Sequence, residues 1–192
     1  SIMEAFSKRL IASCHSITIG SSLLPSTYMG PVIDEEAYHR LKERLLSLKN
    51  DPDIQPLFIG ECGNHGFFIP PAIFAVKSPT HWLMQEELFG PLIALYHAKT
   101  LDDALTVANN TRFGLTGAFF SRSPVNIERA KSLFNVGNLY INQKCTGALV
   151  YRQPFGGFKM SGTGLKAGGP HYLLSFVDAK VVSENTMRRG FT

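Results

Sequence analysis

Residues 137–162 have the sequence GNLYINQKCTGALVYRQPFGGFKMSG, and this stretch decides the expected fold. Its first part, 138–142, alternates in the manner of a β-strand, and a polar loop of small residues, 143–148, follows. Small residues let backbone N–H groups approach a ligand closely, and Phe155 and Phe158 can form the wall of a pocket. A plain surface loop would have the same composition, so composition alone leaves both interpretations open.

Strand and helix patterns alternate along the chain that leads up to this stretch. The apolar run at 92–98 suits a strand buried on both faces, and a helix is expected behind the capping box at 100–103. A strand at 115–120, a helix capped by Ser123 and the strand at 138–142 follow. This order predicts right-handed crossovers and an α/β fold, with a mostly parallel sheet and flanking helices. Ligands bind outside the carboxyl ends of such strands, where the loop after Asn142 lies.

The remaining elements are predicted from local patterns. Helical spacing of apolar residues indicates one helix at 2–14 and a second that begins after the N-cap Asp34. Short β-type runs occur at 56–60 and 67–70, and a last one at 175–183 follows a connection rich in glycine.

Charge and hydropathy exclude two classes of partner. The 192 residues carry 19 Lys and Arg against 15 Asp and Glu, a net charge of +4. No basic run is longer than the pair Arg188-Arg189, so no nucleic-acid partner is expected. The longest apolar run, 67–76, contains two prolines and is far shorter than the roughly 20 residues of a membrane helix, so no membrane segment is expected.

The three cysteines, Cys14, Cys62 and Cys145, are an odd and sparse set. They predict no disulfide framework and favour a reducing compartment, the cytoplasm. Cys62 and His65 supply two metal ligands where a structural zinc needs four, so no metal site is expected. The pattern Gly-x-Gly-x-x-Ala at 162–167 has no preceding strand and no βαβ unit, which argues against a dinucleotide fingerprint there.

Two candidate chemical groups remain. Glu86 and Glu87 precede Phe89-Gly-Pro, and a carboxylate can accept both hydroxyls of a ribose while a neighbouring aromatic packs on a nicotinamide ring. An acidic loop before a strand is the alternative. Cys145 follows a lysine in a loop after a strand, so it is either a nucleophile or a loop thiol near the ligand.

Two motifs carry a family resemblance. QEELFGP at 85–91 and the stretch 137–162 resemble the C-terminal part of an aldehyde dehydrogenase. Within the second motif, the sequence TGALV…QPFGG is similar to the branch of the family that oxidises glutamate semialdehyde, the Δ1-pyrroline-5-carboxylate dehydrogenases. The ending GGPHYLLSF…VVSENTMRRGF is similar to the tail of bifunctional proline-utilisation proteins. The similarity covers essentially the whole chain.

The resemblance implies a role for six residues. Glu87 would hold the nicotinamide ribose of NAD and Phe89 would lie beside the nicotinamide. Thr146 would belong to the substrate-binding loop, Gly147 and Ala148 after it would anchor the substrate α-carboxylate through backbone N–H groups, and Phe155 would line the aliphatic stem of the aldehyde. FAD is implied only for a parent protein that is joined to a proline dehydrogenase domain.

The order of the family's motifs along the sequence also indicates which catalytic residues are expected outside this chain. In the family, the nucleophilic cysteine lies well upstream of the segment that resembles TYMGPVIDE, whereas Cys145 lies downstream of QEELFGP, so Cys145 is expected to be a loop thiol near the substrate. The catalytic nucleophile and the general base are expected upstream of Ser1, in a longer polypeptide. The isolated chain is therefore expected to be inactive.

By the same resemblance, residues 1–174 form part of the catalytic domain. Residues 175–192 form an oligomerisation tail, with self-association through 175–186. Two alternatives remain open. One is a non-catalytic, aldehyde-dehydrogenase-like structural or oligomerisation domain, and the other is a dehydrogenase for an aldehyde without an α-carboxylate.

Overall fold

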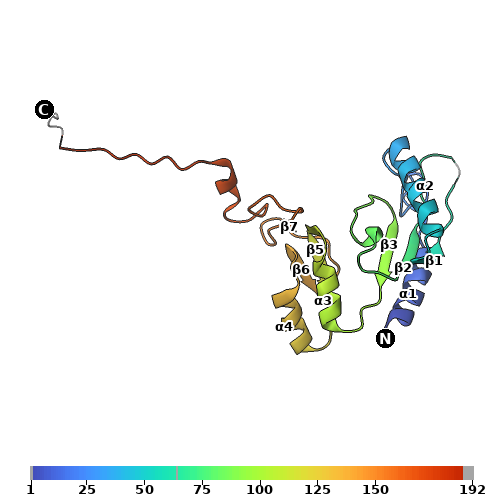
Figure 1. Cartoon of the computed structure of the whole chain (residues 1–192). Coiled ribbons are helices and arrows are strands. Elements are labelled where there is room, and N and C mark those ends of the chain that lie inside the picture. The colour runs from blue at the N-terminus through green and yellow to red at the C-terminus, as the bar shows by residue number, and fades with distance from the viewer. Residues whose placement is uncertain (1, 64, 188–192) are drawn as a thin grey trace. The chain divides into compact units, whose positions relative to one another are not determined.

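The computed structural model describes residues 2–63 and 65–187 (Figure 1). The chain divides into two compact units, residues 1–107 and 108–192. Among the described residues, the first unit has a three-stranded sheet and the second has two sheets of two strands each. The α/β character expected from the sequence is confirmed in both.

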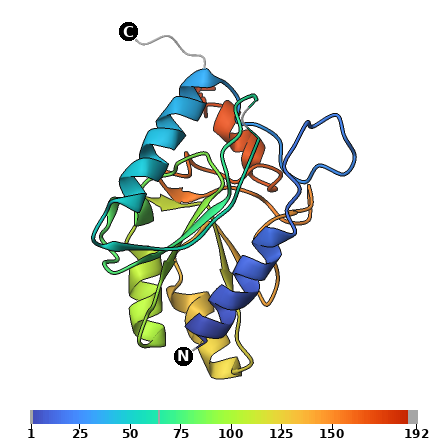
Figure 2. The ribbon, with the colours of Figure 1, turned by 90° about the vertical axis from the view of Figure 1, so that its right-hand side faces the viewer.

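The first unit contains two long helices and a three-stranded sheet. The helices are α1 (Met3–His15) and α2 (Glu35–Lys49), coloured dark and light blue in Figure 2. The strands β1 (Ile54–Ile59), β2 (Ala72–Val76) and β3 (Leu92–Tyr96) have the order β1-β2-β3, and a short 3-10 helix, η1 (Trp82–Met84), precedes β3. Strands β2 and β3 are parallel, while β1 and β2 are antiparallel.

Helix α2 forms the core of this unit with strand β2. Its predicted N-cap is confirmed, because the Asp34 carboxylate accepts a hydrogen bond of 2.8 Å from the Ala37 N–H. Three leucines spaced four and three residues apart then face the sheet, and Leu41 and Leu48 are fully buried together with Phe74 of β2. The periodicity of the sequence therefore placed the helix and its buried face correctly.

The second unit is built on a strand–helix–strand segment. The strands β5 (Thr116–Phe119) and β6 (Asn138–Ile141) are parallel, and α4 (Pro124–Leu133) connects them. Ser123 accepts a hydrogen bond from the Asn126 N–H at 3.4 Å, as its predicted N-cap role requires. Two-residue strands β4 (Phe113–Gly114) and β7 (Phe158–Lys159) form an antiparallel pair, and η2 (Tyr172–Phe176) follows.

Helix α3 (Leu101–Asn109) contains the boundary between the two units. The N-cap half of its predicted capping box is confirmed, while the Asp103 side chain bonds the residue before the N-cap instead of the N-cap itself. Thr100 Oγ1 accepts from the Asp103 N–H at 3.1 Å, and Asp103 Oδ2 accepts from the Lys99 N–H at 2.9 Å.

Several sequence predictions need correction. The strand expected at 67–70 lies instead at 72–76, because Pro70 and Pro71 have no N–H to donate to a ladder and the strand begins only after them. The strand expected to be buried on both faces, 92–98, ends at Tyr96, and Ile93 is 44% exposed. Strand β2 is the buried one, because it has neighbours on both sides.

The strand expected at 175–183 is absent from this single chain. Residues 175 and 176 belong to η2, and 177–185 have no regular secondary structure, because a strand needs a partner to which it can hydrogen-bond. Residues 188–192 of the expected tail lie outside the described residues. Within the described residues, no helix has the length and apolar character needed to cross a membrane.

Candidate active-site segments

The segment 85–91 places one buried side chain between two exposed ones. Leu88 is 9% exposed and belongs to the core, while Glu87 and Phe89 on either side of it are exposed. Gly90 follows where a Cβ would come within 2.7 Å of the buried Leu41 side chain, so a larger residue would have to displace Leu41 from the core. The buried leucine therefore anchors a turn that presents a carboxylate and an aromatic ring to the exterior.

Phe89 has a backbone conformation that a phenylalanine rarely adopts. Its φ of 54° lies in the left-handed region, and its ring is 77% exposed. A left-handed conformation costs a residue with a Cβ about 1–2 kcal/mol. Strain of this kind persists where the surroundings fix the conformation, and it clusters at ligand sites.

Helix α2 fixes the segment through two arginines one turn apart. Arg40 Nη1 donates to the Leu88 carbonyl at 3.0 Å, which holds the peptide next to Phe89. Arg44 Nη2 lies 3.4 Å from Glu86 Oε2, and its guanidinium lies 4.8 Å from the centre of the Trp82 ring. Sequence inspection missed these two residues, although their spacing of four puts them on one helix face.

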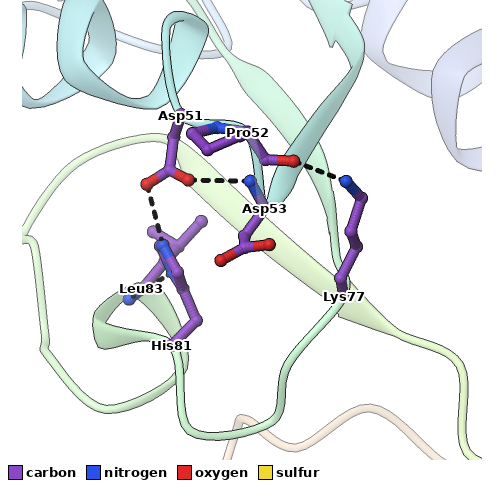
Figure 3. Close-up of polar contacts among 6 residues, drawn as sticks. All are labelled: Asp51, Pro52, Asp53, Lys77, His81 and Leu83. Carbon is purple, nitrogen blue, oxygen red and sulfur yellow. Dashed lines mark hydrogen bonds and ion pairs between the residues drawn. The ribbon is translucent and has the colours of Figure 1, made fainter.

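A second set of contacts holds η1, which precedes the segment (Figure 3). His81 Nε2 lies 3.1 Å from Asp51 Oδ2, and His81 Nδ1 accepts from the Leu83 N–H at 3.1 Å. Asp51 Oδ1 accepts from the Asp53 N–H at 2.9 Å, and the Lys77 ammonium donates to the Pro52 carbonyl. Because Nδ1 must accept, the proton of the neutral ring lies on Nε2 and points to Asp51.

The pKa of the Asp51 carboxyl is lowered from its ordinary value of 3.8. The largest cause is the hydrogen bond from the Asp53 backbone N–H, and the hydrogen bond from His81 is the next. Both bonds favour the ionised carboxylate. This cluster therefore links the turn after α2 to the start of η1.

A groove of about 720 Å³ lies beside Phe89 in the first unit. The loop before α2 forms one wall, and Phe89, Gly90 and Pro91 contribute to the other. Its further lining includes Ala37 and Arg40 of α2. The exposed ring of Phe89 thus borders a space that a planar ligand can enter.

The second unit contains a pocket of about 470 Å³ that gathers the predicted substrate residues. Its lining is Cys145, Thr146, Gly147, Ala148, Val150, Gln153, Phe155, Ala167 and Gly168. All four residues expected to bind substrate are among them, and so is Cys145. Phe158, the other aromatic expected at a wall, is not among the lining residues and pairs with Gly114 in the β4–β7 ladder.

The backbone at the pocket's loop is suited to an anion. Gly147 has a φ of 84°, which favours glycine, and no atom lies within 4 Å of the position its Cβ would take. Within the described residues, the N–H groups of Gly147 and Ala148 donate no hydrogen bond. Two adjacent free donors at a loop that turns through a left-handed residue can form an anion-binding nest.

The other candidates of the sequence do not form sites. Burial raises the pKa of the Cys62 thiol, whose sulfur lies 3.5 Å from the Phe68 carbonyl. No cluster of three or more potential metal ligands occurs in residues 2–63 and 65–187.

Glu87 and Phe89 lie in the first unit, and the pocket residues lie in the second.

A model of the aldehyde dehydrogenase family matches residues 1–182. The chain belongs to this family. Among curated relatives, it is 48% identical to the 1-pyrroline-5-carboxylate dehydrogenase of Geobacillus sp. (strain WCH70), over 92% of this chain and 34% of that protein. It is 45% identical to the enzyme of the same name from Bacillus subtilis, with the same coverage. The chain thus spans about a third of the length of these relatives.

Solved structures agree with this placement. The chain resembles proline utilization A (PutA) from Bdellovibrio bacteriovorus, inactivated by N-propargylglycine, with a TM-score of 0.90 and 47% identity, over 99% of this chain and 20% of that one. It also resembles 1-pyrroline-5-carboxylate dehydrogenase from Thermus with bound NAD, with a TM-score of 0.83 and 37% identity, over 92% and 34%.

The Asp51–His81 cluster predicts a pH dependence of stability. A carboxyl whose pKa is lowered in the folded state contributes stability above its ordinary pKa of 3.8, and that contribution is lost as the pH falls through the folded pKa. Asp51→Asn should lower the urea midpoint at pH 7 and flatten its decrease on the acid side. Trp82, next to His81 and the only tryptophan, reports the transition by its fluorescence.

Asp53→Asn is the matched control. The Asp53 carboxylate accepts no hydrogen bond from the described residues, so this variant should retain the acid dependence of the wild type. A wild-type pH profile in Asp51→Asn, or equal changes in both variants, would contradict the assignment.

Proposed function

We propose that this chain supplies part of an NAD-dependent dehydrogenase that oxidises L-glutamate γ-semialdehyde, formed from Δ1-pyrroline-5-carboxylate, to L-glutamate in proline catabolism. The observation that carries the proposal is the pocket in which Thr146, Gly147, Ala148 and Phe155 come together. The names of the relatives, 1-pyrroline-5-carboxylate dehydrogenase and proline utilization A, support the same substrate.

The pocket suits a substrate with a carboxylate at one end and a short aliphatic stem. The two free N–H groups of Gly147 and Ala148 would hold the carboxylate without a cation. Phe155, which is 39% exposed at the pocket, would pack against the methylene groups of the stem. Together these contacts orient the aldehyde end away from the carboxylate anchor.

NAD, when bound, accepts the hydride in this proposal, and two residues of the first unit would hold it. The Glu87 carboxylate is exposed and can accept hydrogen bonds from both hydroxyls of a ribose. The Phe89 ring is fixed beside a groove, where it can pack on the flat face of a nicotinamide. FAD enters only if the parent polypeptide also carries a proline dehydrogenase domain.

The covalent steps need groups that we place in the remainder of the parent enzyme. In the family's chemistry, a cysteine thiolate adds to the aldehyde carbon, the hydride leaves to NAD⁺, and the resulting thioester is hydrolysed by water with a glutamate as base. By the order of the family's motifs, neither the nucleophile nor the base is expected among the residues of this chain. We therefore propose that the 192 residues alone have no dehydrogenase activity, and that Cys145 is a thiol beside the substrate. Three free cysteines support a cytoplasmic location.

The first test addresses the carboxylate anchor. In the parent enzyme, meaning a polypeptide that carries these residues together with the family's nucleophile and nucleotide-binding segments, Gly147→Val should lower kcat/KM for glutamate semialdehyde by about a hundredfold, because the branched side chain disfavours the left-handed backbone and fills the anion site. Activity on propanal, which has no carboxylate, should fall much less.

Gly164→Val is the control for backbone strain. Gly164 also has a positive φ, 148°, with open space around it, but it does not line the pocket. Equal losses on both aldehydes in Gly147→Val would exclude the anchor. A wild-type enzyme with no preference for glutamate semialdehyde would favour an aldehyde dehydrogenase for another substrate, and one inactive on every aldehyde would favour a structural domain.

The second test addresses the cofactor side. Glu87→Gln in the parent enzyme keeps the size of the side chain but removes the charge that strengthens ribose hydrogen bonds by about 1–3 kcal/mol. NAD⁺ affinity or hydride transfer should fall about tenfold or more. The adjacent Glu86→Gln is the matched control, because Glu86 is engaged by Arg44, and it should have a smaller effect. Unchanged kinetics in Glu87→Gln would remove this residue from the site.

We also propose that residues 175–186 mediate self-association into a homo-oligomer. This segment exposes four large apolar side chains, Phe176, Val177, Val181 and Val182, and its residues 177–183 belong to no strand of the described part of the chain. An exposed, extended apolar segment is a template for pairing with a second copy. A variant that ends at Leu174 should sediment at a lower oligomeric mass. An unchanged mass would argue against the tail as the contact.

A further inference from the structure

The Asn138 side chain hydrogen-bonds to the backbone on both sides of Phe155. Its Nδ2 donates to the Pro154 carbonyl at 3.0 Å, and its Oδ1 accepts from the Gly156 N–H at 3.2 Å. Asn138 is the first residue of β6, so its own backbone belongs to the β5–β6 ladder. The side-chain amide therefore ties the aromatic wall of the pocket to the sheet, across 16 to 18 residues of chain.

Phe155 itself is held from a second direction. Its N–H donates to the Ala167 carbonyl at 2.9 Å, and its carbonyl accepts from the Ala167 N–H at 3.0 Å. This isolated bridge connects two parts of the same loop region. The Asn138 amide joins both neighbours of Phe155 to β6, while the Lys166 ammonium donates to the carbonyl of Gly137, the residue before β6, and Phe158 pairs with β4.

The local sequence Pro-Phe-Gly-Gly-Phe does not by itself fix one backbone conformation. Two adjacent glycines have wide conformational freedom, and the proline nitrogen donates no hydrogen bond. A primary amide holds a donating NH₂ group and an accepting oxygen at a fixed separation, which matches a carbonyl and an N–H two residues apart. The position of the Phe155 ring thus depends on an interaction remote in sequence.

We propose that Asn138 is a positioning residue that sets the place of Phe155 and thereby the selectivity for the substrate stem. This inference rests on the proposed function, in which Phe155 packs against that stem. Asn138 does not line the pocket, so it acts through Phe155 and not on the substrate. Activity on an aldehyde that reaches across the pocket from Gly147 to Phe155 should depend on the two Asn138 hydrogen bonds, whereas activity on propanal should not.

The test compares Asn138→Leu with Asn109→Leu in the parent enzyme. Asn109 makes the same kind of double contact, since its Nδ2 donates to the Leu133 carbonyl at 2.7 Å and its Oδ1 accepts from the Asn135 N–H at 2.8 Å, but it lies away from the pocket lining. Asn138→Leu should raise KM for glutamate semialdehyde about tenfold, with KM for NAD⁺ and activity on propanal changed less than about threefold. Asn109→Leu should preserve the selectivity ratio.

Asn138→Asp adds an intermediate case. The carboxylate keeps an acceptor for the Gly156 N–H and loses the donor to the Pro154 carbonyl, so its loss of selectivity should lie between those of wild type and Asn138→Leu. Unchanged selectivity in Asn138→Leu, or an equal loss in Asn109→Leu, would overturn the inference.

Hydrogen exchange separates this inference from the proposed function. In Asn138→Leu, the amides of Phe155, Gly156 and Ala167 should exchange at least about tenfold faster, while those of β5 and β6 stay protected. If the wild type shows no preference for glutamate semialdehyde, the proposed substrate is wrong. Unchanged exchange at Phe155 and Ala167 would overturn the positioning role whatever the substrate is.

Discussion

The packing of the α2 leucines against strand β2 is the contact on which the segment 85–91 depends. Leu41 and Phe74 are fully buried there, and Leu88 completes the same core. Because Leu88 is seated in this core, its neighbours Glu87 and Phe89 must project from it. A hydrophobic contact thus determines where a carboxylate and an aromatic ring lie, and Arg40 then fixes the peptide between Leu88 and Phe89.

Side-chain amides have a corresponding role in the second unit, where ladders are short and loops are long. Asn109, Asn138 and Asn142 each donate to a backbone carbonyl and accept from a backbone N–H, and so replace the partner that a further strand would supply. Buried or half-buried backbone groups need such partners. Of the three, Asn138 holds the segment that carries Phe155 at the pocket.

In the proposed function, the two candidate sites would use different chemistry for different ligands. Glu87 and Phe89 would offer a charged carboxylate and an exposed ring on a strained turn, which suits ribose hydroxyls and a flat heterocycle. The pocket of the second unit would offer uncharged backbone donors and Phe155, which suits a small anion with an apolar stem. The order of the family's motifs predicts the nucleophile in neither of them.

The sequence by itself determined the elements whose signals are local. The caps at Asp34, Thr100 and Ser123 and the leucine spacing of α2 were predictable, because the groups involved lie within one or two helical turns. The motifs around Glu87 and Gly147 named the candidate residues through family resemblance. Tertiary structure alone decided that β1 runs antiparallel to β2 and that Asn138 and His81 hold segments 16 to 30 residues away. Such contacts leave no periodicity in the sequence, because each partner satisfies a hydrogen-bonding group that only folding brings within reach.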